Sequence, residues 1–283
     1  MNPTSVAVRA GLARGGIEFR QSLTNGQDLF GMLFWPVIML VVLYFMRDAT
    51  FESSGFGLGA LALPSILGML VAFNGMFGMS QLLATEREDG TLLRAKATPN
   101  GMVGYLVGKI VLVSGWVLVP FVVVLLPGMF MVGGVELDSA GAWLALAGVV
   151  LLGMLATLPI GAIIGSLFTS PRGVGFASMP IMGLVAGWGI FYPITAMPGW
   201  VQGLAQCFPV YWLGLGMRAA MLPDAAAAVE LGGSWRWPAT VAVLGAWSAV
   251  GLVVAPVLLR RMARRESGSS VAARREKAMQ RAY

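Results

Sequence analysis

Long stretches without a charged residue dominate this sequence. Six of them contain no Asp, Glu, Lys or Arg and together cover most of the 283 residues: Leu29 to Met46, Ser53 to Thr85, Ile110 to Val135, Ser139 to Pro171, Gly173 to Met217 and Trp237 to Leu259. A helix needs about 20 apolar residues to cross the hydrocarbon core of a bilayer, where a central charge costs roughly 2.5 to 3.5 kcal/mol. The pattern therefore predicts an integral membrane protein.

The composition leaves no room for a soluble domain. Hydrophobic residues make up 57% of the chain and charged residues 11%, whereas about 25% of the residues in soluble domains are charged. Six spans with short connections use nearly the whole chain. We therefore expect one transmembrane permease domain over residues 1–283, divided into a cytoplasmic amphipathic segment (1–28), a six-span region (29–259) and a basic cytoplasmic tail (260–283).

The basic residues indicate the orientation of the chain. With six spans and a cytoplasmic N-terminus, sixteen of the 19 Lys and Arg residues fall on the cytoplasmic side, as the positive-inside rule requires. This predicts a cell-membrane protein with both termini in the cytoplasm, and it accounts for the net charge of +6 without nucleic-acid binding. The stretch from Gly173 to Met217 is long enough for two spans, but a seventh span would place the basic tail outside.

We predict an all-α membrane fold in which an interfacial helix precedes the first span. Residues 6–25 fit a basic amphipathic helix on the cytoplasmic face, with an apolar stripe formed by Val8, Leu12, Phe19 and Leu23. Glycines weaken a helix, and this segment contains Gly11, Gly15 and Gly16. A partly disordered arm is therefore the alternative.

Two further short helical regions are expected between the spans. Thr85 and Glu88 have the spacing of a capping box, which predicts a cytoplasmic coupling helix between spans two and three. Gly90 and Thr91 offer a second possible start for it. Prolines and aromatic residues from Pro193 to Met217 predict re-entrant outer helices between spans five and six. Glycine pairs such as Gly161 and Gly165 favour close helix packing.

Several kinds of chemistry are missing from the sequence. There is no His, the commonest general base and metal ligand, and the charge-free stretches hold no proton relay. The segment from Gly104 to Lys109 departs in spacing from a phosphate-binding loop. We therefore assign no catalytic, cofactor-binding or metal-binding residue. With no buried charge expected, the cargo is hydrophobic or amphipathic, because a buried ion needs a paired partner.

A set of short motifs resembles a known transporter family. Glu86, Arg87, Glu88, Gly90 and Thr91 end the second span, Ala97-Thr98-Pro99 follows, and Tyr105, Leu106, Gly108 and Lys109 lead into the third span. A proline-containing outer segment leads to Arg218. In these positions the chain resembles the membrane subunit of type 2 ABC exporters, and most of all the daunorubicin-resistance type of permease.

The resemblance implies a permease subunit for ATP-driven export of a drug, natural product or lipid, as in multidrug resistance. ATP and Mg²⁺ are then expected in a separate ABC ATPase, present in two copies under a permease dimer, and this chain itself is not an enzyme. The dimer is expected to be a homodimer, with a heterodimer as the alternative. Membrane lipids complete the expected partners, and no nucleic acid is among them.

Two groups of residues are candidates for these roles. The cytoplasmic loop is predicted to dock the ATPase, because carboxylates suit a basic cleft, a glycine permits a tight turn and leucines can insert as apolar contacts; it comprises Glu86, Arg87, Glu88, Asp89, Gly90, Thr91, Leu92, Leu93 and Arg94. An ordinary solvated loop is the alternative. Phe73, Asn74 and Phe77 are candidates for the substrate path, with core packing as the alternative for the two phenylalanines.

Two other classes of function stay open at this point. A secondary transporter or channel could use uncharged groups such as Asn74, Gln81 and Ser166, and it would transport without an ATPase. A membrane-bound lipid enzyme would show turnover in detergent without any partner. A neighbouring reading frame that encodes an ABC ATPase would favour the export permease.

Overall fold

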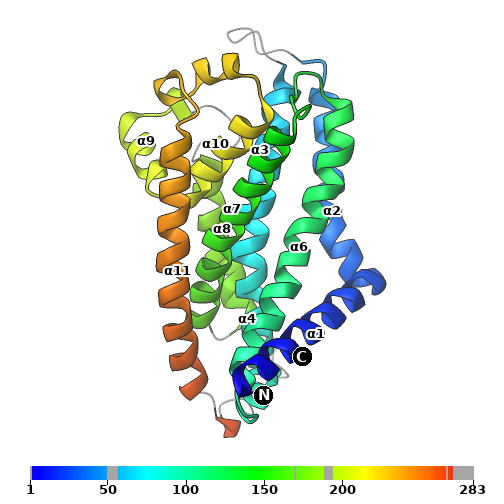
Figure 1. Ribbon diagram of the computed structural model, residues 1–283, viewed down its shortest axis with the longest axis vertical. Coiled ribbons are helices and arrows are strands. Elements are labelled where there is room, and N and C mark those ends of the chain that lie inside the picture. The colour runs from blue at the N-terminus through cyan, green and yellow to red at the C-terminus, as the bar shows by residue number, and fades with distance from the viewer. Residues whose placement is uncertain (1, 50–56, 169, 188–193, 266, 270–283) are drawn as a thin grey trace.

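The computed structural model describes residues 2–49, 57–168, 170–187, 194–265 and 267–269. Every regular element within these ranges is a helix. Figure 1 shows the long helices running along the long axis of the molecule, with α1 (Pro3–Thr24) crossing obliquely at one end and α9 (Gly199–Gln206) lying toward the other. These are called the α1 end and the α9 end below.

Within the described residues, five helical runs are long and apolar enough to cross a membrane. They are α2 (Gly26–Met46), the run of α3 (Leu58–Phe73), η1 (Asn74–Gly78) and α4 (Met79–Glu88), then α6 (Gly101–Met131), α7 (Ala140–Leu167) and α11 (Trp237–Arg265). The expected fifth span begins in α8 (Pro171–Gly187), and its predicted end at Tyr192 lies outside the described residues. The all-α membrane fold is confirmed, and the count of six spans stays a prediction.

Large apolar side chains cover the outside of this bundle. On α2, Phe30, Trp35 and Phe45 are 67%, 60% and 77% exposed, and α11 exposes Val253. Soluble monomers rarely expose apolar patches of such extent, because contact with water is unfavourable. The exposed apolar helices therefore indicate a multi-pass membrane protein whose outer surface faces lipid or another membrane helix.

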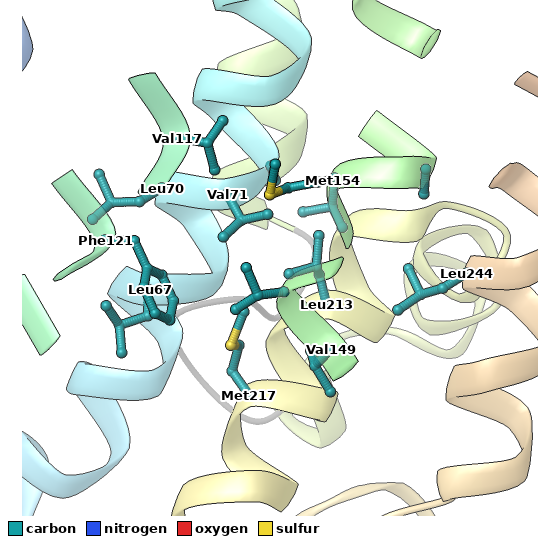
Figure 2. Packing of buried hydrophobic residues seen from close by; sticks show 14 of the residues in the cluster. Leu67, Leu70, Val71, Val117, Phe121, Val149, Met154, Leu213, Met217 and Leu244 are labelled. Carbon is teal, nitrogen blue, oxygen red and sulfur yellow. The ribbon is translucent and has the colours of Figure 1, made fainter. Parts of the chain in front are cut away.

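The core lies where α3, α6, α7 and α10 (Pro209–Met221) meet. Figure 2 shows side chains from these helices filling the space between them, among them Leu67, Val71, Phe121, Val149 and Leu213. Nearly all of α10 is buried, because it packs against α3, α7 and α11. A 13-residue helix is only about 20 Å long, so it cannot cross a hydrocarbon core of about 30 Å.

The segment that was predicted to form short outer helices does so in its described part. It contains η2 (Ile194–Ala196), α9 and the greater part of α10, and two further short helices, η3 (Asp224–Val229) and η4 (Leu231–Gly233), follow it before α11. Trp200 on α9 is 74% exposed. The short helices are thus confirmed, whereas their re-entrant position in a membrane stays a prediction.

The N-terminal segment forms a complete helix, α1, which Asn2 caps by accepting a hydrogen bond from the backbone N–H of Thr4 at 3.1 Å. Two of its glycines, Gly11 and Gly15, were expected to weaken it but lie on the face that packs on α6. A Cβ atom on Gly11 would overlap the carbonyl oxygen of Gly104. Leu12, from the predicted apolar stripe, is instead 50% exposed, and the interfacial role of α1 stays a prediction.

The pair Gly161 and Gly165 packs as the sequence predicts. A Cβ on Gly161 would overlap the carbonyl oxygen of Met76, and one on Gly165 would lie 2.9 Å from the backbone of Ser80. Close approach of this kind lets α7 lie directly against η1 and α4. It places the middle of the second span at the centre of the bundle.

Candidate functional site

The predicted ATPase-docking loop forms a tight turn between two helices. α4 ends at Glu88, Gly90 adopts a left-handed conformation with φ of 79°, and α5 (Thr91–Lys96) begins directly after it. Asp89 Oδ1 accepts a hydrogen bond from the backbone N–H of Thr91 at 2.8 Å. A side chain other than glycine is disfavoured at this φ, so the predicted need for Gly90 is confirmed.

The predicted capping box at Thr85 and Glu88 is wrong. The Thr85 hydroxyl donates to the carbonyl oxygen of Gln81 at 3.0 Å, within α4. The second span therefore continues as a helix through Thr85. The first residue after Thr85 that ends a helix is Gly90. The short cytoplasmic helix is α5, and it starts at the alternative position, Thr91.

Four of the nine docking candidates are buried in their own chain. Glu86 is 9% exposed, Arg87 7% and Leu92 1%, and Gly90 is buried as well. Arg87 Nη1 donates to the carbonyl oxygens of Ser166 and Phe168, at 3.1 and 2.7 Å, near the end of α7. These residues hold the turn in place. The surface left to meet a partner is made by Glu88, Asp89, Thr91, Leu93 and Arg94.

A buried lysine joins three helices just behind this turn. Lys109 of α6 is 2% exposed, and its Nζ lies 2.6 Å from Glu18 Oε2 of α1 and 2.6 Å from Glu86 Oε1 of α4. Arg14 Nε contacts the other oxygen of Glu18 at 2.8 Å. Burial raises the pKa of Glu18, but hydrogen bonds from Lys109 and Arg14 outweigh it, so the net pKa is lowered.

The expectation of no buried charge is therefore wrong. The third apolar stretch begins at Ile110 in the sequence. The helix α6 already starts at Gly101, so Lys109 lies within it and is buried by the neighbouring helices. A second buried pair lies near the α9 end, where Arg218 Nε is 2.6 Å from Glu230 Oε1. A search for charged residues inside the apolar stretches misses both groups. Their residues lie beside or between these stretches in the sequence and become buried only when the helices pack.

The contacts of α1 with α6 extend beyond the lysine. Phe19 lies so close to Gly115 that a Cβ there would overlap its ring. The indole Nε1 of Trp116 donates to Ser22 Oγ at 3.2 Å. Lys109 and Trp116 are seven residues apart and so face the same side of α6. The helix α1 is thus fixed to α6 from Gly11 to Ser22.

A cavity of about 820 Å³ lies among α2, the α3–η1 run, α6 and α8. Phe73, Asn74 and Phe77, the three substrate-path candidates, all line it, together with Trp35 of α2 and Trp116 of α6. The rings of Phe73 and Phe77 stack with centroids 5.1 Å apart. Cavities of roughly 300 to 1,000 Å³ hold drug-sized ligands. The structure therefore brings the three candidates together on the wall of one cavity.

A π-helical turn shapes this wall. Residues Asn74–Gly78 form η1 between α3 and α4, and such single wide turns often occur at functional sites. Gly75 packs so tightly on Thr157 of α7 that a Cβ would overlap its hydroxyl. The side chain of Asn74 makes no hydrogen bond with any described residue, so its amide is available to the cavity.

The fold defines a polytopic helical membrane protein, and its cavity has the volume that a drug-sized ligand needs. The sequence model of the ABC-2 family transporter proteins matches residues 45–253, and the chain belongs to that family. It is thus the membrane subunit of an ABC transporter, a class in which an ABC ATPase supplies energy. No curated protein matches the chain. The matched range excludes α1 and all but the last two residues of α2.

Proposed function

We propose that this chain is the permease subunit of an ATP-driven exporter that moves a hydrophobic or amphipathic substrate out of the cell. Family membership supports an ABC permease. The proposed substrate type rests on the large cavity, whose wall is mostly apolar and aromatic, and the proposed direction rests on the resemblance of the sequence motifs to type 2 ABC exporters. In this proposal the α1 end faces the cytoplasm, where a separate ATPase binds ATP and Mg²⁺.

One observation carries this proposal: the same helical run holds the three substrate-path candidates and the first three docking candidates. The run from Leu58 to Glu88 is continuous. It presents Phe73, Asn74 and Phe77 to the cavity and then ends at the Gly90 turn. Glu88 lies eleven residues beyond Phe77, about 16 Å along a helix axis. A push on the turn therefore has a direct path to the cavity wall.

The contacts that hold the Gly90 turn explain how a movement of the ATPase could reach the cavity. Glu86 and Arg87 bind α4 to α6 and α7 through buried contacts, so α4 cannot move independently of its neighbours. Above it, the π-helical turn η1 offers a place where the helix can tighten or widen. Force on α5 would shift α4 and change the space between Phe73 and α2.

The proposed assembly has two permeases and two ATPases. α2 has a largely exposed apolar face with Phe30, Phe34 and Phe45, which is suited to a second membrane helix. A homodimer needs only this chain, whereas a heterodimer needs a second permease in the same complex. Chemical cross-linking of the purified protein in lipid discs tests this, and a strictly monomeric permease in the active complex would contradict it.

The proposed orientation is tested by labelling with a membrane-impermeant thiol reagent. In a Cys207→Ser background, single cysteines at Asp138 and at Ser269 should react from opposite sides of the membrane. If both positions reacted from the outside, the seven-span alternative would apply and the basic tail would be extracellular.

The function itself is tested by reconstituting the permease with its ABC ATPase partner. We expect ATP-dependent efflux from vesicles, which Glu88→Lys or Arg94→Glu reduces several-fold by weakening ATPase binding. Asp48→Lys, at an exposed position just after the end of α2, serves as the control. Transport by the permease alone would instead indicate a secondary transporter, and lipid turnover in detergent would indicate an enzyme. A double variant of Glu88 and Arg94 with full efflux would refute the docking assignment.

A further inference from the structure

The cavity that holds Phe73 and Phe77 carries a single formal charge on its described wall. Asp28 is the one charged residue among the described residues that line it. It lies in the first turn of α2 and is exposed. Its carboxylate forms no ion pair or hydrogen bond with a described residue, so its charge is not neutralised by a neighbour in this part of the chain.

The carboxylate stands at one end of a long apolar slot. From Asp28 the cavity follows α2 as far as Met39, about 16 Å of helix at 1.5 Å per residue. The other walls are supplied by sulfur and aromatic groups, including Met69, Trp116 and Met182. Thioethers adapt to irregular apolar shapes, and the faces of aromatic rings attract cations. A ligand that fills this slot meets apolar groups along its length and a negative charge at one end.

We propose that Asp28 makes this cavity selective for amphiphiles with a positive charge at one end and an aromatic or aliphatic body. The proposal deepens the export function above and rests on the same cavity. An anionic amphiphile of the same shape is repelled by Asp28, because no Lys or Arg among the described lining residues compensates. A neutral amphiphile gains the apolar contacts only.

The alternative role of Asp28 is structural. An acidic residue in the first turn of a helix stabilises the positive end of the helix dipole, and Asp28 is placed to do so. That role would make Asp28→Asn slightly less stable, but it would not make the cavity distinguish the sign of a ligand's charge. The sign of the charge therefore separates the two roles.

Tetraphenylphosphonium and tetraphenylborate are matched probes, since they share four phenyl rings and differ in the sign of their charge. Binding of each to the purified permease in phosphatidylcholine nanodiscs is measured by equilibrium dialysis, with empty nanodiscs subtracted. We expect the cation to bind, Asp28→Asn to weaken it about five-fold, the range of an exposed ion pair, and Asp28→Glu to retain it. Raising the salt concentration should reduce the difference between the proteins.

Asp48→Asn is the matched control, because it removes the same charge after the other end of α2, where Asp48 pairs with Arg47, and it should leave cation binding unchanged. The Phe73→Ala variant tests whether binding occurs in the cavity. The charge selectivity would be overturned if Asp28→Asn and Asp48→Asn weakened cation binding equally, or if Asp28→Asn weakened binding of both probes equally. Either result would leave the proposed export function unaffected. Binding of neither probe would overturn the selectivity too, whereas the export function is judged separately by ATP-dependent efflux.

Discussion

Replacing Lys109 by methionine tests the buried charge cluster that joins α1, α4 and α6. Methionine keeps the apolar length of the side chain but removes the ammonium group. Glu18 and Glu86, each 2.6 Å from Lys109 Nζ in the wild type, would then face each other without a cation between them. The variant leaves charge uncompensated in a site where Glu86 is 9% exposed.

The loss of stability expected for Lys109→Met follows from the burial of the charged groups that lose their partner. Removing one partner of a buried ion pair costs about 3 to 5 kcal/mol. We expect about 3 kcal/mol here, the lower limit, because the Glu18 side chain is 22% exposed and water screens part of the repulsion. Since 1 kcal/mol shifts the melting temperature of a protein of this size by roughly 2 to 4 °C, the Tm should fall by about 10 °C.

The assay is thermal unfolding of the purified permease in lipid nanodiscs, followed by tryptophan fluorescence. A triple variant with Lys109→Met, Glu18→Gln and Glu86→Gln is the control, because a neutral cluster has no uncompensated charge and should recover most of the lost Tm. A single Lys109→Met variant that melts within 2 °C of the wild type would refute the reasoning. A triple variant as unstable as the single one would show that packing, rather than charge, determines the result.

The same cluster predicts a pH dependence. The pKa of Glu18 is lowered from its ordinary value of 4.5 when the protein is folded, so the unfolded chain binds the proton more readily. The contribution of Glu18 to stability is therefore present above about pH 4.5 and is lost as the pH falls through the folded pKa. Glu18→Gln should flatten the decline in Tm below that pH, and parallel declines in variant and wild type would contradict this.

Two further outcomes are expected. Gly11→Leu should displace α1 from α6 and cost about 1 to 3 kcal/mol, because a Cβ there meets the Gly104 carbonyl, whereas Gly16→Leu has open space; limited proteolysis within α1 measures this, and equal cleavage of the two variants would contradict it. Phe77→Ala should change the rank order of exported compounds at unchanged protein level, whereas Phe45→Ala, 77% exposed, should not; an equal loss of export for every compound would indicate that Phe77 serves packing.

Much of the candidate site was predictable because the signals are local. The turn after the second span follows from Gly90, whose left-handed φ of 79° needs no distant contact. Phe73 and Phe77 share a helix face through their spacing of four, and their rings stack in the structure. The capping box at Thr85 failed because the same spacing also occurs inside helices, and no helix-breaking residue stands before Gly90.

The contacts between distant segments could not be predicted in this way. Glu18 and Lys109 are 91 residues apart, and nothing in either local sequence identifies the other as its partner. The glycines of α1 were expected to weaken the helix, but Gly11 and Gly15 allow α6 to approach. Arg87 was expected to face a partner protein, and it bonds instead to carbonyl oxygens near the end of α7.

The amino-acid sequence by itself determined the membrane class, the all-α fold and the turn at Gly90, because apolar length and backbone freedom are properties of short segments. The tertiary structure alone decided which charges are buried and which face a cavity. A charge beside an apolar stretch is buried or exposed according to the helix that packs over it, and this is why Lys109 lies inside the protein while Asp28 opens onto the cavity.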